Sequence, residues 1–231
     1  MKNLSSIVLI VFTILNLAVF GQVSEVGNSS FKVKYYKYLG VNKTVSKRKA
    51  KFKRVTSALD NGITKIEYIQ ISNDQLRKEQ FLKNGNPVGT WKEYSSAGEL
   101  LNERDLDAIV YCEKEEDEEK TEMDSLTDDR IKDPVFVGGV KKMYSFLSTN
   151  MEYPAYDRDN GKTARIFVEF VIEKNGAVTE VCVQDQDNVS IKLLEYETIR
   201  VVTSMPNWVP GEMDDVPVRV RFKLPISFKL D

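Results

Sequence analysis

The sequence of 231 residues contains 33 Lys and Arg, 35 Asp and Glu and no His, which gives a formal charge of -2. Its 42% hydrophobic and 29% charged residues are typical of a globular protein rather than a disordered or fibrous one. The lack of histidine excludes Ser-His-Asp and Cys-His catalysis and imidazole metal sites, and two cysteines are too few for a zinc cluster. We therefore predict that the protein is not an enzyme and uses no cofactor or metal. Its near-zero charge gives no sign of nucleic-acid binding.

The first 21 residues are predicted to be a signal peptide. Lys2 precedes an apolar run, Leu4–Phe20, that is marginal for a spanning helix, which needs about 20 predominantly apolar residues. Val19 and Gly21 place small residues at the -3 and -1 positions of a cleavage site. We expect export to the periplasm and cleavage after Gly21; the alternative is an uncleaved inner-membrane anchor with the rest of the chain facing the periplasm.

Charge divides the rest of the chain into three parts. Residues 22–104 carry 16 basic and 8 acidic side chains, residues 105–133 carry 4 and 13, and residues 134–231 carry 12 and 14. The middle part includes Glu113–Glu119, with six carboxylates and one lysine, and has few apolar residues. Such a composition favours an extended, mobile linker. We expect a basic region, an acidic linker and a near-neutral C-terminal domain.

The basic region, residues 22–104, is expected to form a series of β-hairpins. Its runs of aromatic and β-branched residues are separated by signals for tight turns. These are Asp60-Asn61-Gly62, Asn84-Gly85 and Ala97-Gly98. The run from Phe81 to Leu100 resembles a MORN-type repeat, a hairpin unit in which Gly makes the turns and Trp and Tyr pack on neighbouring hairpins. Trp91 and Tyr94 also fit a simpler role as core aromatic residues.

One stretch of this region concentrates positive charge. Its six basic residues are Lys47, Arg48, Lys49, Lys51, Lys53 and Arg54. A cluster of this size attracts anionic groups such as phosphates or lipid headgroups. The competing interpretation, which we favour from the sequence, is a solvated strand face that discourages aggregation at a sheet edge.

Export would place the two cysteines in an oxidising compartment. In the predicted strand 178–184, Val181 and Val183 share one face and Cys182 lies on the other, so Cys182 is expected outside the core. A disulfide between Cys112 and Cys182 would tie the linker to the C-terminal domain. The sequence favours two unpaired thiols over this disulfide.

Residues 134–231 show alternating strand and helix patterns. A helix with Val140, Met143 and Leu147 on one face ends before Tyr153-Pro154, and a later hairpin turns at Asn175-Gly176. The second helix is expected to bury Ile191, Leu194, Thr198, Val201 and Met205, and the last strand to present Val218, Val220, Phe222 and Leu224 on one face. This order predicts an α+β domain, a three-stranded antiparallel sheet with two helices on one face, after a mostly β hairpin region.

Five motifs stand in order along these 98 residues. They are Phe136-Val137-Gly138-Gly139, Tyr153-Pro154, the hairpin from Gly161 to Val178, the segment from Met205-Pro206 through Trp208 to Pro210-Gly211, and the run from Pro217 to Phe228. Together they resemble the C-terminal domain of TonB-type energy transducers, in the variant typical of Bacteroidetes. Each motif alone fits an ordinary turn or core role, so the resemblance rests on their order and spacing.

The resemblance implies binding of a protein partner. In that family the domain captures a short peptide, the TonB box, of an outer-membrane receptor, and the peptide adds as a strand to the sheet edge. Inner-membrane partners of the ExbB and ExbD type supply energy from the proton gradient. Carried over to this chain, the capturing edge is the last strand, residues 218–224, bracketed by Pro217 and Pro225. The implied partner-binding residues are Tyr153, Pro154, Val218, Arg219, Val220, Arg221, Phe222, Lys223 and Leu224, with the direction of Arg219 and Arg221 left open.

Two features depart from the family pattern. A full transducer keeps its membrane helix and has a long Pro-rich stretch, whereas this N-terminal segment looks cleavable and the chain has 7 prolines. Two functions therefore stand side by side. One is a periplasmic component of TonB-linked transport across the outer membrane; the other is a non-energised envelope adaptor or structural protein. A homodimer is compatible with either.

Overall fold

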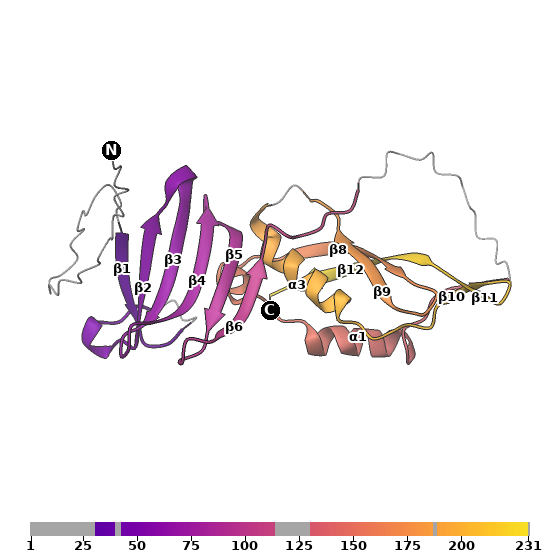
Figure 1. Ribbon diagram of the computed structural model, residues 1–231, viewed down its shortest axis with the longest axis horizontal. Coiled ribbons are helices and arrows are strands. Elements are labelled where there is room, and N and C mark those ends of the chain that lie inside the picture. The colour runs from indigo at the N-terminus through magenta and orange to yellow at the C-terminus, as the bar shows by residue number, and fades with distance from the viewer. Residues whose placement is uncertain (1–30, 40–42, 114–129, 187–188, 231) are drawn as a thin grey trace, which may run out of the picture.

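A six-stranded sheet forms one end of the molecule, and a domain with two three-stranded sheets forms the other (Figure 1). The computed structural model describes residues 31–39, 43–113, 130–186 and 189–230. The predicted signal peptide, residues 1–21, lies outside the described residues. Among the residues that are described, no helix is long and apolar enough to cross a membrane.

The N-terminal region forms a six-stranded antiparallel sheet in which every strand pairs with its neighbour in the chain. Its strands are β1 (Phe31–Tyr36), β2 (Phe52–Ala58), β3 (Ile63–Gln70), β4 (Gln75–Lys83), β5 (Asn86–Tyr94) and β6 (Leu100–Asp105), with short 3-10 turns η1 (Lys47–Lys49) and η2 (Asp60–Gly62). This order confirms the expected hairpins, but the MORN-type repeat is not confirmed. The Asn84-Gly85 turn has positive φ at both residues, 52° and 80°, as a tight two-residue hairpin requires.

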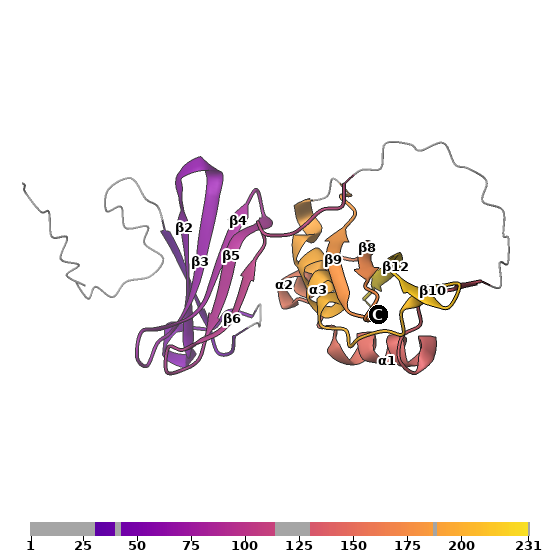
Figure 2. The ribbon, with the colours of Figure 1, turned by 45° about the vertical axis from the view of Figure 1, so that its right-hand side comes forward.

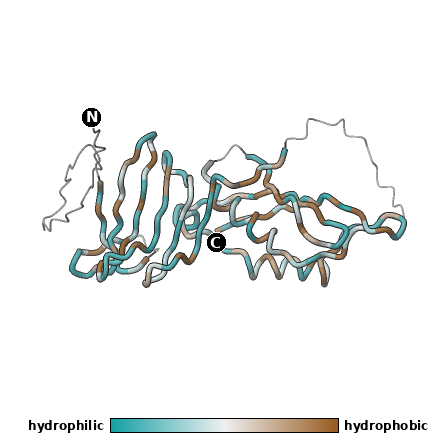
Figure 3. Tube along the Cα trace, viewed as in Figure 1, coloured by the Kyte–Doolittle hydropathy of each residue, from teal (hydrophilic) through white to brown (hydrophobic). Residues whose placement is uncertain are grey.

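This sheet is a single layer over most of its area. Of its strand residues only Tyr36, Ile66, Pro87 and Trp91 are buried, and most others are half-exposed. Hydrophilic and hydrophobic residues alternate along its strands (Figure 3). In the described part of the chain neither face is covered by a complete second layer, and the C-terminal domain lies beside the β5 and β6 end (Figure 2).

The C-terminal domain has the predicted α+β architecture. Its sheet runs in the order β12 (Val220–Phe228), β8 (Ala164–Ile172), β9 (Val178–Val183), and all pairs are antiparallel. Its helices are α1 (Gly139–Asn150), α2 (Ala155–Asp159) and α3 (Lys192–Thr203), preceded by the turn η3 (Val189–Ile191). Met143 and Leu147 of α1 share one core with Leu194 and Val201 of α3, so both helices cover the same face of the sheet.

Several details differ from the sequence predictions. Val140 was expected in the core but is 62% exposed, because α1 rests on Met143 and Leu147 one turn further along. The short helix α2 was not foreseen, nor was a second small sheet of β7 (Ile131–Lys132), β10 (Gly211–Met213) and β11 (Val216–Val218). These strands are too short to produce a readable alternation.

The described ends of the acidic stretch are part of the folded structure. Leu106 is 1% exposed, Ile109 packs against the core of the C-terminal domain, and β7 pairs with β10. The expectation of an extended, mobile linker is therefore wrong for these ends. Single apolar residues within the charged sequence, such as Leu106 and Ile109, pack against buried residues of the folded regions. Residues 114–129 lie outside the described part of the chain.

The N-terminal sheet docks on helices α2 and α3 (Figure 2). Trp91 and Leu106 form a small buried cluster with Leu193, and the ring of Tyr156 stands edge-on to Trp91 at 5.3 Å between centroids. The hydroxyl of Tyr156 also donates to the carbonyl of Gly85 at 2.8 Å, and that of Tyr196 to the carbonyl of Glu103 at 3.3 Å. These contacts fix the sheet beside the domain that carries the candidate site.

Candidate functional site

The strand β12 is an open edge of the C-terminal sheet. It pairs with β8 in a continuous register from Val220 opposite Ile172 to Phe228 opposite Ala164. Among the described residues, no strand pairs with its other side. The main-chain groups on that side are available to an added strand.

Proline 225 shows which main-chain groups face outward. The last strand was predicted at residues 218–224 with Pro217 and Pro225 outside it; in the structure Pro217 lies in β11 and Pro225 lies inside β12, opposite Phe167. Proline has no N–H and is tolerated within a strand only where that group would point away from the neighbour. In an antiparallel pair the outward direction recurs at every second residue. Arg221 and Lys223 therefore present their N–H and C=O groups to the open side.

The side chains of β12 alternate as the sequence predicted. Leu224, Ile226 and Phe228 are buried in the helix-covered core, and Phe222 packs against it. Arg221 and Lys223 are exposed on the opposite face. A strand added to β12 would continue both faces, and each of its side chains would lie beside one of these two rows.

The predicted arginines belong to an ion-pair network on the exposed face. Arg219 bonds Glu173 through Nε at 3.1 Å and Glu180 through Nη2 at 2.5 Å. Arg221 lies 3.5 Å from Glu180, and Lys223 lies 3.2 Å from Glu169. Hydrogen bonds to Glu180 and Glu173 raise the pKa of Arg219, while Thr179 and Arg219 lower the pKa of Glu173. These side chains are held by glutamates of the sheet and do not extend past its edge.

The Tyr153-Pro154 motif lies at the far end of β12. The ring of Tyr153 stands edge-on to Phe228 at 5.5 Å, and its hydroxyl donates to the carbonyl of Lys162. Burial raises the pKa of Tyr153. The structure thus places Tyr153 beside the end of β12, whereas Val218 lies in β11 and Arg219 precedes the first residue of β12.

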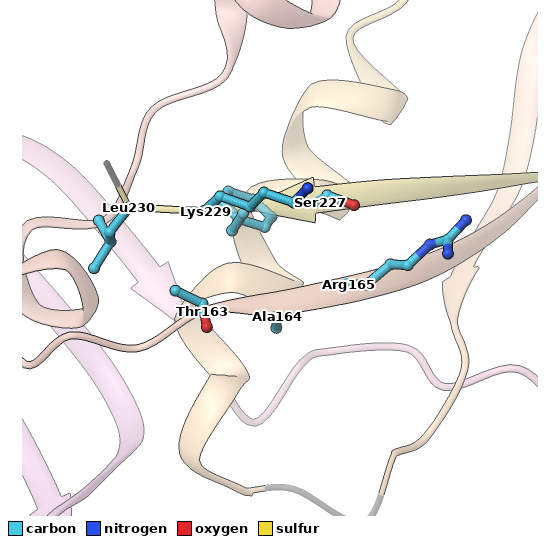
Figure 4. A pocket seen from close by; sticks show the side chains of 7 residues that line it. Thr163, Ala164, Arg165, Ser227, Lys229 and Leu230 are labelled. Carbon is cyan, nitrogen blue, oxygen red and sulfur yellow. The ribbon is translucent and has the colours of Figure 1, made fainter.

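A cavity of about 520 Å³ lies at the same end of β12, between the ends of β8 and β12 (Figure 4). Its lining residues are Thr163, Ala164, Arg165, Ser227, Phe228, Lys229 and Leu230. Figure 4 shows Arg165 and Leu230 at its opposite ends. The sequence prediction missed this cavity because it ended the strand at Leu224.

A second cavity, of about 240 Å³, lies between the two regions of the protein. Tyr153 and Pro154 form part of its wall, and Lys78, Glu93 and Arg104 of the N-terminal sheet form another part. The N-terminal sheet therefore adjoins the end of the candidate edge.

The segment that leaves β6 covers the end of the opposite edge of the sheet, at Val183, the last residue of β9. The N–H of Val183 donates to the carbonyl of Val110 at 3.0 Å, and the N–H of Cys112 donates to the carbonyl of Val183 at 2.9 Å. Tyr111 and Val183 form a parallel bridge. The hydroxyl of Tyr111 donates to the carboxylate of Glu195 at 2.9 Å, and burial raises the pKa of that carboxyl.

A disulfide joins Cys112 to Cys182, so the prediction of two unpaired thiols is wrong. Cys182 lies opposite Glu169, on the face away from the helices, as its alternation indicated. It lies outside the hydrophobic core cluster, as expected, although it is only 7% exposed. The reason is the added segment at Val110–Cys112, which the sequence of the acidic stretch did not reveal.

Within the described residues, no three acidic or cysteine side chains are grouped so that they could hold a metal ion. The contacts described above instead form a small α+β domain with an open sheet edge at β12 and an opposite edge that is covered at Val183, an arrangement suited to binding a protein strand at β12.

Residues 149–230 match the family of the Gram-negative bacterial TonB protein C-terminal. The match runs from the end of α1 to the end of β12 and includes the whole sheet. This part of the chain is thus similar to a non-enzymatic transducer and binding domain of the cell envelope. No curated protein and no solved structure matches the chain.

Proposed function

We propose that the protein acts in the periplasm, in TonB-linked transport across the outer membrane, and that it binds TonB-box peptides of outer-membrane receptors by strand addition to β12. The observation that carries the proposal is the open edge of β12 in a domain similar to the TonB C-terminal family. The main chain of Arg221 and Lys223 would supply the hydrogen bonds. Two rows of side chains on the two faces would select among peptides.

The opposite edge is consistent with the same assignment. Val110–Cys112 pairs with the Val183 end of β9 and is held there by the disulfide, whereas among the described residues no strand pairs with the outer side of β12 at any point along its length. A strand that runs along β12 reaches Tyr153 and the 520 Å³ cavity at its end. We assign Tyr153, Pro154 and the stretch from Val220 to Leu224 to partner binding, with Val218 and Arg219 at the margin of the site.

A direct test removes one outward N–H from the edge. Lys223→Pro deletes that donor and places a ring on the open side, while the bonds between β12 and β8 stay in place. We expect binding of a fluorescent TonB-box peptide, measured by anisotropy, to weaken at least tenfold, which corresponds to about 1.4 kcal/mol. Lys223→Ala is the matched control, since it loses the same side chain and keeps the N–H; it should bind within about threefold of the unaltered protein. Equal affinities for the two variants would contradict strand addition.

A non-energised envelope adaptor is the second candidate. Residues 105–113 lead directly from β6 to the outer side of β9, and the N-terminal sheet docks on α2 and α3. The domain is thus attached to a second folded region rather than carried at the end of a long Pro-rich stretch. In this version the same edge binds envelope partners, or a second copy of the chain, without force.

The two candidates differ in their need for the membrane. An energised transducer requires inner-membrane partners of the ExbB and ExbD type and a retained membrane anchor. Cell fractionation with N-terminal sequencing separates the two. A chain that begins at Gln22 and is free in the periplasm would exclude the anchored transducer and leave the adaptor.

A further inference from the structure

The edge of the N-terminal sheet farthest from the C-terminal domain is strongly basic (Figure 1). Residues 31–59, which include β1, η1 and β2, contain ten basic and no acidic residues. Eight of the ten side chains are exposed: Lys32, Lys34, Lys37, Lys43, Lys47, Arg48, Lys49 and Lys51. We refer to these eight side chains as the basic edge.

Among the described residues, no acidic side chain forms an ion pair with the basic edge. Within the described part of the chain, the ion pairs of residues 31–59 are limited to Lys53 with Asp74, at 2.7 Å. The rest of the same sheet behaves differently: Lys65 lies 2.8 Å from Glu79, and Lys78 lies 3.1 Å from Glu93. Basic residues near the C-terminal domain are thus paired within the sheet, and those at the basic edge are available to a ligand.

Like charges are also placed side by side here. Lys34 of β1 stands directly opposite Arg54 of β2, and such a pair destabilises a sheet. The guanidinium of Arg54 lies over the ring of Tyr36 at 5.8 Å, with no acidic partner among the described residues. An external anion would relieve the repulsion between Lys34 and Arg54.

An aromatic side chain accompanies the charges. Tyr38 is 54% exposed, and the ammonium group of Lys37 lies 5.3 Å from the centre of its ring. Tyrosine beside lysine is typical of protein surfaces at the membrane–water interface, where the ring enters the headgroup layer and the ammonium group meets phosphate.

We propose that the basic edge binds a membrane surface that carries anionic phospholipids. The charges extend along β1, the connection that follows it and η1, up to the start of β2, which suits a flat array of headgroups better than one small anion. β1 is also the strand that the N-terminal segment joins, and the domain with the open β12 edge lies at the opposite end of the molecule (Figure 1). Attachment through the basic edge would leave the domain that carries β12 on the side away from the membrane (Figure 1). The inference is independent of peptide binding at β12.

The test uses the chain without residues 1–21, since the apolar run would itself enter vesicles. Binding is measured by flotation with vesicles of phosphatidylcholine, with and without 30% phosphatidylglycerol. Each basic side chain near an anionic surface strengthens binding about fivefold, so we expect the anionic vesicles to bind at least tenfold more tightly, and the difference to shrink as salt rises. Lys47→Glu/Arg48→Glu/Lys49→Glu, three exposed changes in η1, should abolish the preference.

The matched control makes the same change in net charge on the C-terminal domain. Lys141, Lys142 and Lys174 are exposed, and their replacement by Glu should leave vesicle binding within twofold. Circular dichroism checks that both variants fold. Equal losses in the two triple variants, or no preference for anionic vesicles, would overturn the proposal. Release by 10 mM inorganic phosphate would point to a small-anion site, and tighter binding to duplex DNA would point to nucleic acid; either result would also overturn it.

Discussion

The two sheets of this protein obtain their stability in different ways. In the C-terminal domain, Ile166, Val168, Phe170 and Ile172 of the single strand β8 are all fully buried beneath a helix layer. In the six-stranded sheet, only four strand residues are buried in total. Burial of apolar area is the main favourable term in folding, so the larger sheet has the weaker local source of stability.

The N-terminal sheet compensates at its border with the C-terminal domain. Its buried cluster is completed by Leu193 of α3 and by the ring of Tyr156 beside Trp91. Within the sheet, cross-strand ion pairs such as Lys65 with Glu79 add little, because half-exposed pairs are screened by water. The stability of the larger sheet therefore depends on its contacts with the smaller domain, and few residues make those contacts.

The two tryptophans allow the comparison to be tested directly. Trp91 and Trp208 are each 4% exposed, but Trp208 lies among Phe136, Phe170 and Phe222, whereas Trp91 lies at the border between the regions. We expect Trp208→Ala to lower the free energy of unfolding of the C-terminal domain by about 4 kcal/mol, and Trp91→Ala to destabilise the N-terminal sheet by about 3 kcal/mol. The chain has 2 tryptophans, so each variant retains one fluorescent reporter of the other region.

Urea titrations followed by that fluorescence, together with hydrogen exchange, measure the two effects. In Trp91→Ala, amides of β4 to β6 should exchange faster. The free energy of unfolding that Trp208 fluorescence reports should stay within about 0.5 kcal/mol of that of the unaltered protein. If Trp91→Ala shifted both regions equally, the two would unfold as one cooperative unit and the proposed one-way dependence would be wrong.

Sequence patterns predicted the C-terminal sheet and its core well. Ile191, Leu194, Thr198, Val201 and Met205 are all buried, as their helical spacing indicated. The Asn175-Gly176 turn also follows from the sequence, and the structure adds a reason: a Cβ on Gly176 would lie 1.9 Å from the carbonyl oxygen of Trp208. Periodicity and turn signals are local, so local elements were predictable.

Features that join distant segments were not predictable. Val110 bonds Val183 at the β9 edge, and Trp91 packs on Tyr156 at the border between the regions. Neither contact produces a periodic pattern in the sequence. The open edge was predicted on the right strand because of the family resemblance, but its bounds were wrong. Pro225 was interpreted as a strand end, whereas an edge strand tolerates proline within it.

The disulfide holds the segment that leads from the larger sheet to the smaller domain. It closes a loop with a sequence separation of 70. Replacing both Cys112 and Cys182 with Ser should cost about 3 kcal/mol, because the unfolded chain regains the entropy that the cross-link removes. Urea unfolding measures this cost, and hydrogen exchange should show faster exchange at Val183 while β12 stays protected. Faster exchange at β12 instead would contradict the expectation that loss of the disulfide loosens the β9 edge of the sheet and leaves the β12 edge unchanged.

The smallest expected effect concerns α2, the helix that carries Tyr156 to the border between the regions. Asp157 is fully buried, and neither of its carboxylate oxygens has a hydrogen-bond partner among the described residues. Burial raises its pKa to about 6, although Lys162 acts to lower it. Because this folded-state pKa lies above the value of about 3.9 for the unfolded chain, the folded state loses stability as pH rises from about 4 to above 6.

Asp157→Asn removes the buried charge and should raise the free energy of unfolding by about 2 kcal/mol at pH 8. The gain should be mostly lost at pH 4, where the unaltered carboxyl is protonated in the folded state and about half protonated in the unfolded state. Asp159→Asn, an exposed change in the same helix, is the control and should show no such dependence on pH. Equal gains for Asp157→Asn at pH 8 and pH 4 would mean that shape, not charge, limits the stability of α2. Docking of the larger sheet on this helix would then not depend on the ionisation of Asp157.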